Sequence, residues 1–118
     1  MSAAEATAAD SARVLVVEDD ATLRAALRDT LQIGGYQVLA AADGRAALSE
    51  LERGPVDLVI SDVQMDRMDG QQLLRAVRSR RPELPFVMIT AHGSVEDAVA
   101  AIRAGATDYL LKPFEAEV

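Results

Sequence analysis

The stretch Asp57-Leu58-Val59-Ile60-Ser61-Asp62 predicts the fold of this chain. A short apolar run, residues 58–60, is followed closely by a loop, which is typical of a strand buried in the middle of a parallel sheet. Because Asp62 is the last residue of this strand, we expect it at the carboxyl edge of the sheet. Ligands bind at that edge in open α/β sheets, although a single aspartate there would as readily cap the next turn.

Length and composition restrict the class of protein. The chain has 118 residues, of which 50% are hydrophobic, enough for one domain with a core and too few for two. The absence of cysteine excludes disulfides and thiolate chemistry. The net charge of −7 argues against direct contact with nucleic acid. No apolar run is long enough to cross a membrane and no signal pattern is present, so we expect a cytoplasmic protein.

Four further apolar runs predict strands and alternate with helical patterns; they are residues 14–17, 36–42, 86–89 and 109–111. This alternation predicts an α/β fold, a single doubly wound parallel sheet of five strands with helices on both faces. Residues 1–12 carry no apolar face and are expected to be a disordered tail, so the predicted domain covers residues 13–118.

The predicted helices begin after capping or turn residues, such as Asp20, Asp43-Gly44, Asp69-Gly70 and Ser94. The positions expected to face the sheet are Leu23, Ala26, Leu27, Thr30 and Leu31 in the first helix; Ala47, Leu48 and Leu51 in the second; Leu73, Leu74 and Val77 in the third; and Val95, Ala98, Val99 and Ile102 in the fourth. The solvated face and end of the third helix are expected to carry Arg75, Arg78, Arg80 and Arg81.

Polar residues stand at the ends of four of the predicted strands. Glu18 and Asp19 follow the first strand, Asp62 ends the third, Thr90 ends the fourth and Lys112 follows the fifth. In a parallel sheet these ends lie at one edge, so three carboxylates are expected to meet and to repel one another unless a cation is present. A set of oxygen ligands without His or Cys favours Mg²⁺, or Mn²⁺ in its place.

The same group of residues indicates phosphoryl chemistry. Lys112 supplies a positive charge and Thr90 a hydroxyl, which together with a metal ion would hold a phosphoryl group. Asp62 offers a carboxylate that can act as its acceptor.

Five separated motifs strengthen this interpretation. They are Val17-Glu18-Asp19-Asp20, Arg24, Asp62-x-x-Met65-x-x-Met68-Asp69-Gly70, Thr90-Ala91 and Lys112-Pro113-Phe114. Over about residues 13–114 the pattern resembles the receiver domain of two-component response regulators. The resemblance implies the flavodoxin-like strand order 2-1-3-4-5. The stretches 90–94 and 103–109 look most like receivers fused to enhancer-binding transcription activators.

The resemblance implies a role for each site residue. Asp62 would accept a phosphoryl group from a sensor histidine kinase, so the domain would be a phosphoacceptor and not an enzyme for external substrates. Asp19, Asp62 and the backbone carbonyl of Gln64 would bind Mg²⁺ directly. Glu18 would act mostly through water, and Lys112 would contact the phosphoryl oxygens.

Signal output follows from the same resemblance. Thr90 and Tyr109 would be the switch residues. They would act on a C-terminal effector domain, expected to be transcriptional, that this sequence does not include. The Lys112–Pro113 peptide would be cis. One position departs from the usual pattern, because Asp66 stands after Met65 where many receivers have proline, which predicts a less rigid loop.

Three other functions share parts of this pattern. A flavodoxin-type FMN binder has the same architecture, but the acidic end of the first strand would repel its phosphate. A phosphatase with an aspartate nucleophile usually carries a second acid two residues on, where this chain has Gln64. A degenerate receiver that serves only as an interaction module would lack some of the chemical positions, and here all of them are present.

The end of the sequence generates a prediction about stability. Only four residues follow Phe114, about one helical turn, whereas receivers carry a full fifth helix at this place. We therefore expect the amino-terminal part of a longer regulator, with its fifth helix truncated and sheet positions uncovered. Such a chain should form a homodimer or melt below a version extended by one helix. Light scattering and thermal melts of both lengths test this; a short form that stays monomeric and melts equally high would contradict it.

Overall fold

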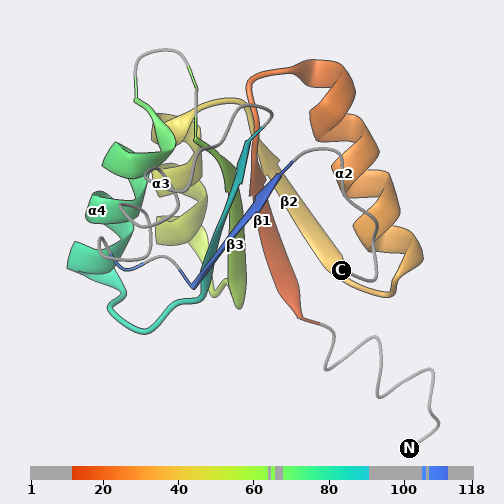
Figure 1. The fold of residues 1–118 in the computed structure, drawn as a ribbon. Coiled ribbons are helices and arrows are strands. Elements are labelled where there is room, and N and C mark those ends of the chain that lie inside the picture. The colour runs from red at the N-terminus through yellow and green to blue at the C-terminus, as the bar shows by residue number, and fades with distance from the viewer. Residues whose placement is uncertain (1–11, 64, 66–67, 91–104, 106, 112–118) are drawn as a thin grey trace, which may run out of the picture.

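The computed structural model describes residues 12–63, 65, 68–90, 105 and 107–111, and for Thr90 and residues 108–111 the backbone alone. It is a parallel sheet with helices on both faces (Figure 1). In chain order the elements are β1 (Arg13–Val17), α2 (Ala21–Ile33), β2 (Gln37–Ala41), α3 (Gly44–Arg53), β3 (Leu58–Asp62), α4 (Gly70–Arg80), β4 (Phe86–Thr90) and β5 (Asp108–Leu111). In this described part, no helix has both the length and the apolar character needed to cross a membrane.

The predicted parallel α/β sheet is confirmed. Its strands are ordered β2-β1-β3-β4-β5, and every neighbouring pair is parallel. For the first four strands this is the order that the receiver resemblance implied, and β5 extends the sheet beyond β4. The helix expected after Ser94, the truncated fifth helix and residues 1–11 of the expected tail lie outside the described residues. Ala12 accepts a hydrogen bond from the Gln37 backbone N–H at 3.0 Å, so it already belongs to the edge of the sheet.

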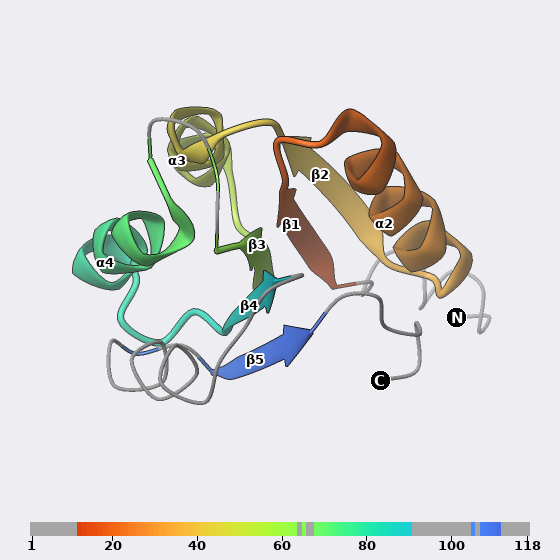
Figure 2. The same cartoon turned by 45° about the horizontal axis from the view of Figure 1, so that its top comes forward.

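Alternating residues of β1 divide the core into two layers. Leu15 and Val17 pack with α3 and α4, whereas Val14 and Val16 pack with Leu27 of α2. Figure 2 shows the same division, with α2 on one side of the sheet and α3 and α4 on the other. Since both faces are covered, β1 is apolar at every position after Arg13, as its unbroken hydrophobic run predicted.

The first helix begins and ends where the sequence predicted, but its buried stripe is narrower. The Asp20 carboxylate accepts hydrogen bonds from the backbone N–H groups of Thr22 and Leu23, at 2.9 and 3.1 Å. The expectation that Ala26 and Thr30 face the sheet is wrong, because both are exposed. Each stands one residue before a leucine of the buried stripe, and successive helical residues are rotated by about 100°, so both side chains are turned away from the sheet. The buried stripe of α2 consists of Leu23, Leu27 and Leu31.

The other two described helices begin where the sequence predicted a turn, at Asp43-Gly44, and a helix start, at Asp69-Gly70. Asp43 caps α3 by accepting from the Ala46 N–H at 2.8 Å. Asp69 and Gln72 form a reciprocal capping box at the start of α4, at 2.8 and 3.0 Å. The core positions expected in these helices are confirmed. Leu48 is half-buried, and the others are buried: Ala47, Leu51, Leu73, Leu74 and Val77.

The arginines of α4 are only partly the solvated face that the sequence predicted. Arg75 and Arg80 are exposed, but Arg78 and Arg81 are half-buried and donate to backbone carbonyls. Arg78 reaches the carbonyl of Gly105 with Nε at 2.9 Å and Nη2 at 2.7 Å, and that of Leu84 with Nη1 at 2.5 Å. Loops leave such carbonyls without strand or helix partners, and a guanidinium has enough donors for several of them.

We expect Arg78→Met to lower the free energy of unfolding by about 2 kcal/mol, because it removes charge-assisted hydrogen bonds from partly buried carbonyls. Arg75→Met is the matched control, since it removes the same charge from an exposed position of the same helix and should cost less than about 0.5 kcal/mol. Urea denaturation of both variants measures the difference. Equal stabilities would show that Arg78 does not hold the loops together.

Candidate functional site

Three carboxylates meet at the carboxyl edge of the sheet. Glu18 and Asp19 follow β1 and Asp62 ends β3, and one carboxylate oxygen from each lies within 4.8 Å of the others. The parallel pairing of Val17 with Ser61 produces this proximity, because the residues that follow are then neighbours. The meeting of these acids at one edge is what the strand ends in the sequence predicted.

The acids differ in exposure. Glu18 is 1% exposed and Asp62 is 6% exposed, whereas Asp19 is open to solvent. Burying a carboxylate costs free energy unless opposite charge or hydrogen bonds compensate, and a second and third negative charge nearby raise that cost. The group is therefore suited to a cation that approaches from the solvent side, where Asp19 lies.

The backbone between β1 and α2 is held on both sides of Glu18. The backbone N–H of Glu18 donates to the carbonyl of Ala41 at 3.1 Å. The carbonyl of Glu18 accepts from Arg24 Nη1 at 2.8 Å. Asp20 caps α2, so its carboxylate has a structural role, as expected from the sequence. This leaves Glu18 and Asp19 as the acids of the segment that the capping of α2 does not explain.

The loop after Asp62 is positioned by a close approach that the sequence did not reveal. Val63 donates to the carbonyl of Ile89 at 3.0 Å, and Gly70 donates to the carbonyl of Val63 at 2.8 Å. A Cβ at Gly70 would collide with the carbonyl oxygen of Asp62 and lie 2.9 Å from the Cα of Val63. The sequence indicated only a helix start here; glycine is needed because the helix begins against the backbone of Asp62.

The other predicted site residues are placed less completely. The backbone of Thr90 ends β4, one residue beyond Ile89, which pairs with Asp62. Tyr109 pairs with Met88 in the β4–β5 ladder. The side chains of these two residues lie outside the described part of the structure, as do Gln64, Lys112 and the expected cis peptide.

The described donor set fits a magnesium ion. It consists of carboxylate oxygens, the ligands that Mg²⁺ prefers. Oxygens on opposite sides of an octahedral Mg²⁺ are about 4.2 Å apart, given Mg–O distances of about 2.1 Å. A spread of up to 4.8 Å is slightly wider than this, so a small movement of the carboxylates or a bridging water would let the group hold the ion.

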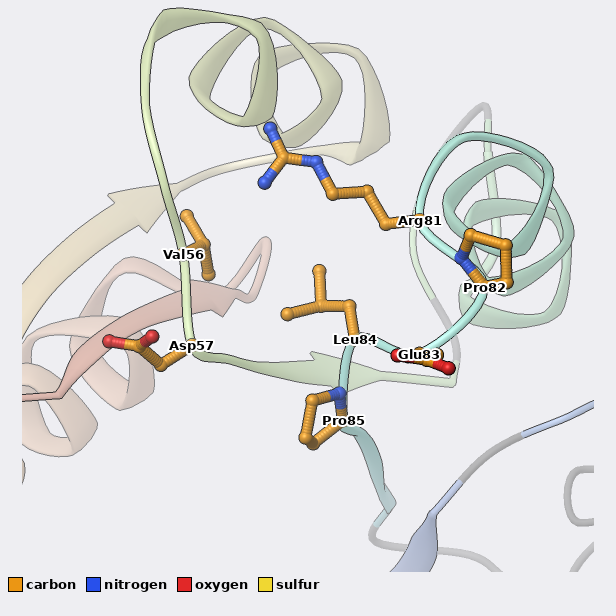
Figure 3. A pocket seen from close by; sticks show the side chains of 7 residues that line it. All are labelled: Val56, Asp57, Arg81, Pro82, Glu83, Leu84 and Pro85. Atoms are coloured by element: carbon orange, nitrogen blue, oxygen red, sulfur yellow. The ribbon is translucent and has the colours of Figure 1, made fainter.

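A separate hollow lies at the opposite edge of the sheet (Figure 3). It has a volume of about 490 Å³ and is open to solvent; its lining residues are Val56, Asp57, Arg81, Pro82, Glu83, Leu84 and Pro85. These residues precede β3 and β4, whereas the acidic cluster follows β1 and ends β3. The Arg81 guanidinium is already bound to the carbonyl of Leu51 at 2.6 Å. The acidic edge, and not this hollow, is therefore the candidate site.

Comparison with known proteins agrees with the geometry of this edge. The family model for the response regulator receiver domain matches residues 14–118. Response regulator protein FleR of Pseudomonas aeruginosa is 55% identical over 106 residues, which cover 90% of this chain and 22% of that protein. Response regulator MprA of Mycolicibacterium vanbaalenii is 46% identical over 105 residues, covering 89% and 46%. The chain thus spans less than half the length of these curated relatives.

Solved structures show the same fold. Chemotaxis protein CheY4 of Vibrio cholerae superposes with a TM-score of 0.86 at 40% identity, over 91% of each chain. The receiver domain of NtrX from Brucella abortus gives a TM-score of 0.83 at 39% identity, over 88% of each chain. Because the family model spans nearly the whole chain and relatives and structures of the same kind agree with it, the chain belongs to the receiver domains of response regulators, the phosphoacceptor modules of two-component systems.

Proposed function

We propose that Asp62 is the phosphoacceptor of this receiver and takes a phosphoryl group from a sensor histidine kinase in a Mg²⁺-dependent reaction. The observation that carries the proposal is the meeting of Glu18, Asp19 and Asp62 within 4.8 Å at the carboxyl edge of the sheet. Membership of the receiver family supports the reaction type. The position of Asp62 at the end of a buried strand supports its assignment as the acceptor.

In the proposed reaction a carboxylate oxygen of Asp62 forms a bond to phosphorus while the P–N bond to the kinase histidine breaks. Glu18, Asp19 and Asp62 would hold Mg²⁺, which when bound neutralises charge on the phosphoryl oxygens. Asp62 is 6% exposed, so the surrounding protein restricts the directions from which a donor can approach it. Such positioning is the main contribution a protein makes to phosphoryl transfer.

The remaining roles rest on the receiver resemblance. We assign Lys112 to the phosphoryl oxygens, the Gln64 carbonyl to the metal, and Thr90 and Tyr109 to the switch. FleR and MprA extend well beyond the part that matches this chain, which supports an effector domain as the recipient of the signal. With relatives that are named response regulators, we propose transcriptional output and action in the cytoplasm.

Phosphorylation by a small donor tests the acceptor. With acetyl phosphate and Mg²⁺, intact-mass spectrometry should show the addition of one phosphoryl group to the wild type and none to Asp62→Asn. Asp20→Asn is the matched control: it removes the same charge two residues from Glu18, and asparagine still caps α2, so the variant should be phosphorylated. A wild type that stays unmodified, or an Asp62→Asn variant that is modified, would contradict the proposal.

The lifetime of the phosphoaspartate forms a second test. Gln64 and His92 stand two residues after Asp62 and Thr90, and the receiver resemblance implies that these two positions tune autodephosphorylation. We expect their side chains to border the path of the hydrolytic water. Gln64→Ala and His92→Ala should alter the half-life of the modified protein without preventing its formation. Decay measured after removal of the donor decides this, and equal rates in the wild type and both variants would argue against the assignment.

A further inference from the structure

Arg24 contacts the backbone that carries two of the three acids. It is the fourth residue of α2, the helix that follows β1. Its Nη1 donates to the carbonyl oxygen of Glu18 at 2.8 Å, in a partly buried contact. This carbonyl belongs to the peptide that joins Glu18 to Asp19. The arginine therefore binds the peptide group that links the two acids.

The start of a helix is an unfavourable place for a cation, because the helix dipole leaves partial positive charge there. The backbone N–H of Arg24 donates to the Asp20 carbonyl at 2.8 Å, which places the residue one turn into α2. Helical side chains point back toward the amino terminus, so this position directs the guanidinium at the preceding loop. Helix stability does not explain a cation here, whereas the bond to Glu18 does.

We propose that Arg24 is a positioning residue for the Mg²⁺ site: by holding the Glu18–Asp19 peptide it sets the direction in which both carboxylates project. The inference rests on the proposed function. Glu18 is fixed on its amino side by the bond to Ala41 at 3.1 Å and on its carbonyl side by Arg24 at 2.8 Å. Groups that orient metal ligands contribute to affinity without touching the metal.

A purely electrostatic role for Arg24 predicts the opposite effect. A cation near the site repels Mg²⁺, so loss of its charge alone would tighten binding. Loss of a positioning hydrogen bond would weaken binding, because the carboxylates would sample more orientations. The sign of the change in affinity therefore separates the two roles.

The experiment compares Arg24→Met, Arg24→Lys and Arg28→Met by isothermal titration calorimetry with MgCl₂ at constant ionic strength. Arg24→Met should raise the Kd for Mg²⁺ roughly tenfold, the scale typical of lost ligand-orienting contacts. Arg24→Lys keeps the charge but has a shorter reach and no planar fork, so its Kd should lie between those of Arg24→Met and wild type. Arg28, one turn further along α2, is exposed and pairs with Asp29 at 3.4 Å. Its replacement removes the same charge and should change the Kd by less than about twofold, since exposed charges are screened.

Thermal melts without Mg²⁺ separate positioning from a loss of fold, because a merely structural role would lower the melting temperature and leave the Kd of the folded protein unchanged. An Arg24→Met variant that binds Mg²⁺ as tightly as the wild type, or more tightly, would overturn the inference. If that variant does not fold, Arg24→Lys decides, and an unchanged Kd there would overturn it. A wild type without measurable Mg²⁺ affinity would refute the proposed function itself, a result distinguishable from a failure confined to Arg24.

Discussion

The parallel pairing of β1 with β3 is the constraint on which the acidic site depends. Parallel strands end at the same edge, and the register that sets Val17 beside Ser61 fixes which residues become neighbours beyond the last pair. Both strands are covered on both faces, so their interior is apolar and charge is confined to the ends. A shift of either strand by one residue would separate the acids and also turn apolar side chains to the wrong layer.

A concentration of negative charge at the rim of an apolar core works against folding in the absence of a cation. The neighbouring backbone offsets part of this cost, because hydrogen bonds to Ala41 and from Arg24 hold Glu18, and Gly70 allows α4 to begin directly against Asp62. A ligand that binds only the folded state adds stability in proportion to its binding free energy. The backbone of the site is thus fixed by hydrogen bonds, and a bound cation would reduce the repulsion among its carboxylates.

The sequence predicted correctly those features that depend on residues close together in the chain, such as buried strands and helix caps. The strand at 58–60 and the caps Asp20 and Asp69 follow from neighbours in sequence. The convergence of the acids followed from the parallel sheet that the alternation of strands and helices predicted. The strand order came with the receiver resemblance and not from periodicity. Contacts between distant segments could not be foreseen: the burial of Arg78 depends on carbonyls supplied by residues 84 and 105, and the need for glycine at position 70 depends on the backbone of Asp62.

The two ends of α4 are bound to opposite edges of the sheet. At its first residue Gly70 lies against Asp62, and near its last turn Arg78 binds Leu84 and Gly105. The helix has 11 residues, about 16 Å in length, which matches the span of a five-residue strand. Inserting or deleting one residue within it would rotate one end by about 100° relative to the other and break one of these attachments. Changes of chain length around α4 are therefore confined to the loops that flank it, and the length of this helix is a fixed dimension of the domain.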